Sequence, residues 1–130
     1  MNRSFAIPIQ VETGSDDPSA HLAHHNHLLL FQKARQAWLG QFGYTERNIE
    51  GLRMFVVEAN CVYKAELFNR DNVQVTCQPE SVTGKLFTLS YTIERQGRVC
   101  ARGFTKCMCV APVTRKSVPL PEAFVIDMVG

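Results

Sequence analysis

Apolar positions along the chain repeat in two different ways, and their order predicts the architecture. Between residues 5 and 13 apolar and polar side chains alternate, with Phe5, Ile7 and Ile9 on one face, as in a half-buried strand. Turn-forming residues then make 14–21 a loop. From about His24 the spacing changes to three and four residues, which predicts one long amphipathic helix ending near Gly43. Its apolar stripe consists of His27, Leu30, Phe31, Ala34, Trp38 and Phe42.

From residue 53 onward the period is two. Four strands are predicted there, separated by polar turns at 69–72, 81–84 and 96–97. Short turns make consecutive strands antiparallel neighbours. One helix is ~10 Å across, whereas five strands span about 20 Å or more, so the sheet must curl or a partner must cover the remainder. The predicted fold is α+β, a long central helix wrapped by a curled antiparallel five-stranded sheet, in a single domain over 1–130.

Three finer predictions follow from the same patterns. Alternation along 53–65 places Phe55 and Val57 on the inward face of a long strand, in line with Cys61 and Tyr63. The segment 45–50 is expected to form one short helical turn. The tail from Pro112 contains three prolines and is expected to wrap the surface.

Composition narrows the class of protein. A formal net charge of +2 on 130 residues does not indicate a nucleic-acid partner. The beginning of the chain lacks the pattern of a signal peptide, and no segment is long enough to cross a bilayer. Five cysteines lie in apolar strand-like segments without a C-x-x-C pair, which indicates buried thiols and a cytoplasmic location. We expect no cofactor and no metal, although Cys107 and Cys109 share a face.

The segment Ser15 to His27 is the strongest candidate for chemistry. It places two carboxylates and four histidines in a loop that meets the start of the long helix. A helix N-terminus presents unpaired N–H groups and partial positive charge, which can hold the oxyanion of an acyl-transfer reaction. Asp17, a few residues upstream, could attack the acyl carbon or activate a water. An aspartate before proline also suits an ordinary turn, and the histidines also suit exposed or hydrogen-bonding roles.

An ordered set of residues resembles a known family. The set is Asp17, Ala20, His24, Asn26, His27, Phe31, Ala34, Arg35, Trp38 and Leu39, followed by Tyr63 and Asp71 and a T-R-x-x-x-x-L-P-like stretch at 114–121. In this order the chain resembles the 4-hydroxybenzoyl-CoA thioesterase family of hotdog proteins. It differs from the family pattern in having Ala20 in place of glycine and His27 in place of tyrosine. From the residues alone, Trp38 is expected in the core, and Arg35 is expected in an ion pair or at the surface.

The resemblance implies particular roles. Asp17 matches the family's catalytic aspartate, and the backbone N–H of His24 matches the amide that polarises the thioester carbonyl. The His24 side chain matches a histidine of a bacterial acyl-CoA thioesterase branch, and Asn26, His27 and Tyr63 are expected to contact substrate. Family members form dimers with joined sheets, often paired into tetramers, so a homodimer or homotetramer is expected.

The predicted function is hydrolysis of an acyl-CoA or acyl-carrier-protein thioester to free acid and thiol. Asp17 would act as nucleophile, or as a general base whose pKa partial burial would raise. Basic side chains are candidates to hold coenzyme phosphates: Lys64, Lys85, Arg98 and Lys106. Two alternatives remain open, a non-catalytic acyl-CoA-binding or assembly module, and a hydratase or dehydratase that uses His24 with Asp17.

Overall fold

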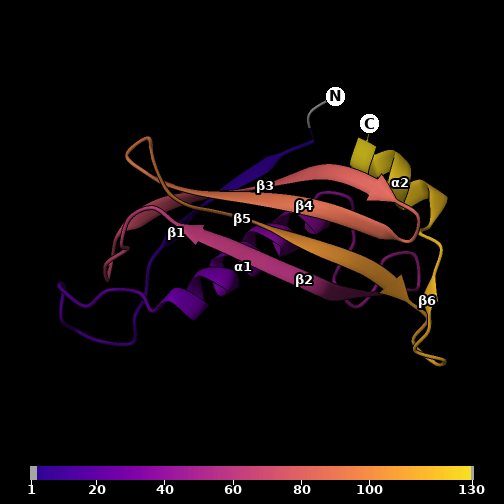
Figure 1. The fold of residues 1–130 in the computed structure, drawn as a ribbon, viewed down its shortest axis with the longest axis horizontal. Helices are drawn as coiled ribbons and strands as arrows, with labels where there is room; N and C mark the ends of the chain where they lie inside the picture. The colour runs from indigo at the N-terminus through magenta and orange to yellow at the C-terminus, as the bar shows by residue number, and fades with distance from the viewer. Residues whose placement is uncertain (1–2, 130) are drawn as a thin grey trace.

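The computed structural model describes residues 3–129, and it consists of one curled antiparallel sheet around a long helix (Figure 1). The elements are β1 (Phe5–Gln10), the 3-10 helix η1 (His24–Asn26), α1 (His27–Gly40), β2 (Arg53–Tyr63), β3 (Asn72–Thr83), β4 (Leu86–Arg95), β5 (Arg98–Val110), β6 (Ser117–Val118) and α2 (Glu122–Val129). The strand order is β1-β3-β4-β5-β2, with the short β6 paired to β5. The predicted α+β architecture is therefore confirmed, and β6 adds a sixth strand.

Short turns set the register of the three central strands. The turn between β4 and β5 has Gln96 at φ 52° and Gly97 at φ 77°, the two left-handed residues of a turn that suits twisted strands. Alternation along β4 then directs Phe87, Leu89 and Ile93 toward α1, where each is fully buried. The period-two pattern of the sequence thus corresponds directly to the concave face of the sheet.

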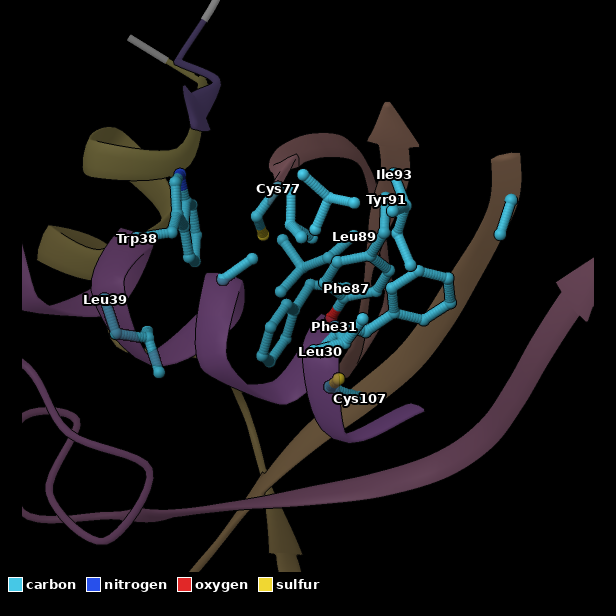
Figure 2. Close-up of a cluster of buried hydrophobic side chains, with 14 of the residues drawn as sticks. Leu30, Phe31, Trp38, Leu39, Cys77, Phe87, Leu89, Tyr91, Ile93 and Cys107 are labelled. Carbon is cyan, nitrogen blue, oxygen red and sulfur yellow. The ribbon is translucent and has the colours of Figure 1, made fainter. Parts of the chain in front are cut away.

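The core lies between α1 and that concave face. Figure 2 shows Leu30 and Phe31 of α1 beside side chains of β4, and Trp38 and Leu39, further along the helix, are also buried. The Phe31 and Tyr91 rings stack with centroids 4.6 Å apart. Trp38 is fully buried, as expected for a core residue. The stripe of apolar positions at helical spacing therefore predicted the buried face of α1 correctly.

The predicted inward face of β2 is wrong in its first half. Phe55 is 57% exposed and Val57 is 47% exposed, whereas Met54 and Val56 are partly buried against the core. The pairing of β2 with β5 shifts between Val56 and Glu58, which marks a β-bulge. One extra residue reverses the faces of a strand, so the alternation before the bulge is out of phase with the alternation after it.

One other local prediction is also wrong. Segment 45–50 is not helical: isolated bridges at Thr45 and Ile49 close tight turns, and Glu50 has φ 53°. The tail from Pro112 also contains two elements outside the predicted five strands and one helix, β6 before Pro119 and α2 after Pro121. Phe124 of α2 is fully buried and meets the Trp38 ring at 6.2 Å, so α2 closes one end of the core.

Two further expectations concern the cysteine thiols, expected to be buried, and the absence of a segment that could cross a bilayer. All five thiols are free, and four are buried, while Cys61 is partly exposed. Burial raises the pKa of the Cys109 thiol to about 11. Within residues 3–129, no helix has the length and apolar character that a bilayer crossing requires.

Candidate active site

The start of the long helix lies at the end of the sheet away from α2 (Figure 1). The 3-10 helix η1 leads into α1, and neither Ala23 nor Asn26, the two N-cap residues, forms a side-chain capping bond. Within the described part of the chain the His24 N–H has no acceptor. A free amide at a helix N-terminus carries partial positive charge. The site therefore offers an unused hydrogen-bond donor.

Three aromatic side chains gather at this helix start. The His24 ring stacks on Tyr63, at the end of β2, with centroids 4.3 Å apart and planes at 21°. The His27 ring meets Tyr63 edge-on at 4.9 Å. The Tyr63 hydroxyl also donates to the His24 carbonyl at 2.9 Å. The structure thus brings together three of the five predicted site residues, although Tyr63 is 39 residues from His24 along the chain.

His27 is the buried member of this cluster. Its side chain is 1% exposed, and Nδ1 lies 3.3 Å from the Ala23 carbonyl and 3.2 Å from the His24 carbonyl. Nε2 is buried and has no hydrogen-bond partner among residues 3–129. Burial lowers the pKa of His27, which outweighs the opposing effect of the two carbonyls. The ring is therefore neutral at physiological pH.

Asp17 lies in the loop before the helix and is exposed. Its Oδ1 accepts the Ser19 backbone N–H at 2.9 Å and the Ser19 hydroxyl at 2.8 Å. These bonds lower the pKa of Asp17, the backbone bond having the larger effect. The expected rise in pKa through burial is therefore wrong for this chain. No hydrogen bond or ring contact joins Asp17 to His24, His27 or Tyr63 within the described residues.

Asn69 anchors the loop that carries Asp17. This buried residue accepts the Thr13 N–H through Oδ1 at 3.2 Å and donates from Nδ2 to the Ser15 carbonyl at 2.6 Å. Its backbone N–H also donates to the Ala20 carbonyl at 2.8 Å. Sequence reasoning assigned Asn69 only to a polar turn. Its sole signal was an amide side chain at the turn, since the two partners of that side chain are more than 50 positions away.

Two hollows adjoin the helix start and the helix body. An open pocket of about 190 Å³ is lined by Leu22, His24, His27, Tyr63, Lys64, Ala65 and Glu66. A groove of about 310 Å³ runs between α1 and β2 and is lined mainly by Leu28, Leu29, Phe31, Val56 and Ala59. Of the four candidate phosphate-binding residues, only Lys64 lines either hollow. Asn26 is partly buried, and its backbone N–H donates to the Ala23 carbonyl.

A polar network lies at the base of the groove. Arg35 is 5% exposed and donates to the Tyr91 hydroxyl at 3.1 Å, and it pairs with Glu46 at 3.5 Å. Of the two expectations for Arg35, the ion pair is found and the surface position is not. The Tyr91 hydroxyl also bonds Thr105 at 2.6 Å. Within residues 3–129, no three His, Cys, Asp or Glu side chains are grouped closely enough to hold a metal.

Comparison with known proteins decides the family. The model of the Thioesterase-like superfamily matches residues 11–126. This chain belongs to that superfamily. A 1,4-dihydroxy-2-naphthoyl-CoA hydrolase of Thermosynechococcus vestitus is 30% identical over 114 residues, which are 83% of this chain and 77% of that protein. One of Microcystis aeruginosa is 27% identical over 113 residues, 84% of this chain and 82% of that protein.

Solved structures agree on the fold. A hypothetical protein of Aquifex aeolicus superposes with a TM-score of 0.85 at 25% identity, covering 95% of this chain and 98% of that one. A 1,4-dihydroxy-2-naphthoyl-CoA thioesterase of Synechocystis has a TM-score of 0.84 at 22% identity, covering 96% and 95%. The hotdog fold and the predicted class of enzyme, a thioesterase, are thus confirmed. The narrower assignment to the 4-hydroxybenzoyl-CoA family stays a prediction.

Proposed function

We propose that this thioesterase hydrolyses an acyl-CoA thioester at the start of α1, with Asp17 and the backbone amide of His24 as its catalytic groups. One observation carries the proposal: the helix start is uncapped, so the His24 N–H is free beside a pocket. Asp17 precedes that amide by seven positions, the spacing of the family pattern. Curated relatives named as 1,4-dihydroxy-2-naphthoyl-CoA hydrolases make a hydroxylated aromatic acyl group the first candidate.

The proposed chemistry follows from the donor and the carboxylate. The thioester carbonyl oxygen accepts the His24 N–H, which stabilises the negative charge that develops there. A lowered pKa keeps Asp17 ionised at neutral pH, the state that a nucleophile and a general base both require, and we propose the nucleophilic route. Its oxygen bonds to the acyl carbon, the carbon–sulfur bond breaks, and coenzyme A leaves as a thiolate. Water then cleaves the resulting mixed anhydride to free acid and regenerates Asp17.

The two hollows provide places for the ends of the substrate. The apolar groove between α1 and β2 suits the acyl group. Lys64, at the pocket by Tyr63, is the candidate partner for a coenzyme phosphate, and Asn26 and Tyr63 are proposed to contact the arm between them. An acyl-carrier protein could present the same thioester, so it remains the second candidate carrier.

A homodimer or homotetramer is proposed from the free edge of the sheet. β2 is an edge strand, and Phe55, Val57 and Val62 on it are all more than 45% exposed. Long apolar edge strands favour pairing with another chain. Sedimentation velocity should show at least a dimer, and Val57→Lys should shift the population toward monomer. A wild-type monomer at micromolar concentration would contradict this assembly. The cytoplasmic location stays a prediction from the free thiols.

Thiol release from a panel of acyl-CoA esters tests the proposed function. The panel contains 1,4-dihydroxy-2-naphthoyl-CoA, benzoyl-CoA, and short and long aliphatic acyl-CoAs, with mass spectrometry of the acid product. We expect turnover of at least one ester, with the hydroxylated aromatic ester preferred. Saturable binding without release would instead support an acyl-binding module, and hydration of an enoyl-CoA without thiol release would support a hydratase.

A further inference from the structure

His27 has a buried imidazole whose two nitrogens have very different surroundings. Nδ1 faces the carbonyl oxygens of Ala23 and His24, while Nε2 is buried without a partner among residues 3–129. In the Nε2–H tautomer, the Nδ1 lone pair would face two carbonyl oxygens, which is repulsive. In the imidazolium, a charged N–H at Nε2 would be buried without an acceptor. The surroundings therefore select the neutral Nδ1–H tautomer.

That N–H contacts the peptide unit that matters for the proposed reaction. The Ala23 carbonyl and the His24 N–H are the two ends of one planar peptide. The Ala23 carbonyl accepts bonds from His27 Nδ1 and from the Asn26 backbone N–H at 3.0 Å. A bond accepted at the carbonyl orients the peptide plane and increases the polarity of the N–H at its other end.

The following peptide is held in the same way. The His24 carbonyl accepts the Nδ1–H of His27 and also the Tyr63 hydroxyl, 2.9 Å away. Both peptides that flank the His24 Cα atom are thus tied to side chains of the site. Helix ends fray where no cap residue holds them. At this uncapped helix start the bonds from His27 and Tyr63 restrain the backbone, as a cap residue would otherwise do.

We propose that His27 is a positioning residue for thioester hydrolysis: its Nδ1–H holds the Ala23–His24 peptide so that the His24 N–H points at the thioester oxygen. This role rests on the proposed function. It differs from the substrate contact that the family resemblance implied for this position. The buried Nε2 fits the difference: although His27 lines the pocket, its ring is 1% exposed and its unpartnered nitrogen is not open to a ligand there.

Three substitutions separate the bond at Nδ1 from the bulk of the ring. His27→Asn places an amide N–H near the position of Nδ1, His27→Gln moves it toward the position of Nε2, and His27→Phe keeps the ring without a donor. Loss of a whole oxyanion donor costs about 100- to 1,000-fold in kcat. We expect His27→Phe and His27→Gln to lower kcat by ~10- to 100-fold with KM changed less than ~3-fold, and His27→Asn to recover most of that loss.

Nitrogen-15 NMR of the wild-type protein tests the contact without any variant. The imidazole nitrogens of His27 should report the neutral Nδ1–H tautomer at pH 7, and the His24 amide resonance should shift in His27→Phe but much less in His27→Asn. An Nε2–H or doubly protonated ring would overturn the proposal. So would a kcat within ~3-fold of wild type in His27→Phe, or equal losses in the Asn and Phe variants. If wild type hydrolyses no ester, the function fails, and the NMR result still decides the contact.

Discussion

Gly103 of β5 has no room for a side chain between the Phe31 ring of α1 and the backbone of β2, so Gly103→Ala tests the packing directly. A methyl group there would collide with the Asn60 carbonyl oxygen of β2 and with the Phe31 ring of α1. Phe31 is itself held against Tyr91, and both side chains are at most 2% exposed. Neither neighbour can move away easily, because one is backbone and the other is a packed ring.

The expected cost of Gly103→Ala follows from these contacts. Overpacking in a core costs about 1–3 kcal/mol, and a clash with backbone belongs at the upper end, so we expect ~3 kcal/mol. With a urea m-value of about 1.5 kcal/mol/M, the unfolding midpoint should fall by ~2 M. A displaced Phe31 should also narrow the groove between α1 and β2 and lower turnover of bulky acyl groups.

Gly40→Ala provides the matched control for this substitution. A methyl group at Gly40, the last residue of α1, meets no atom within 4 Å. Alanine is the better helix former, so the free energy of unfolding should rise by up to about 1 kcal/mol. A Gly103→Ala midpoint within ~0.3 M of wild type would refute the argued contact between α1 and the sheet.

Three further predictions concern the loop and the helix start. Asn69→Ala should destabilise the protein by about 2 kcal/mol in urea unfolding and lower kcat, whereas Asn69→Asp should keep the bond to the Thr13 N–H. An unchanged kcat in Asn69→Ala would contradict the role of Asn69 in holding the loop of Asp17. Ser19→Ala removes a hydrogen bond that lowers the pKa of Asp17, so the acid limb of the kcat/KM profile should move to higher pH. If the limb does not move, Asp17 is not the group whose ionisation it reports. The pKa of His27 in the folded protein lies below its ordinary value of 6.5, so the unfolded chain binds more protons than the folded chain below pH 6.5. The free energy of unfolding of the wild type should therefore fall from pH 7 to about 5. A pH dependence just as steep in His27→Phe would contradict this role of His27.

The sequence predicted the elements whose residues repeat regularly. Leu30, Phe31 and Trp38 recur at helical spacing, and Phe87 and Leu89 alternate, so α1 and β4 were read correctly from local pattern. These patterns reflect burial on one face, which each element encodes by itself.

What the sequence did not reveal depends on breaks in pattern or on distant partners. The run Met54–Val57 is apolar at every position, so alternation could not locate the bulge that turns Phe55 and Val57 outward. The helix α2 follows a proline-rich stretch that favours irregular structure, and its local signal is Pro121 followed by Glu122, a pair typical of a helix start.

The local features of the candidate site could be predicted from the sequence, and its long-range contacts could not. The helix start and its carboxylate loop are local features, and the resemblance assigned their roles. The stack of His24 on Tyr63 and the anchoring by Asn69 join segments far apart in the chain, so no local pattern shows them. The lowered pKa of Asp17 depends on the Ser19 bonds, which only the folded loop creates.

The central claim, that Asp17 is the catalytic carboxylate, is tested most directly by comparing Asp17→Asn with Asp16→Asn. Both residues are exposed in the same loop, so the second variant controls for the loss of a charge there. Measured as thiol release from the best acyl-CoA of the panel, kcat should fall at least ~100-fold in Asp17→Asn and stay within ~3-fold of wild type in Asp16→Asn. A near-native kcat in Asp17→Asn, or equal losses in both variants, would contradict the assignment of Asp17.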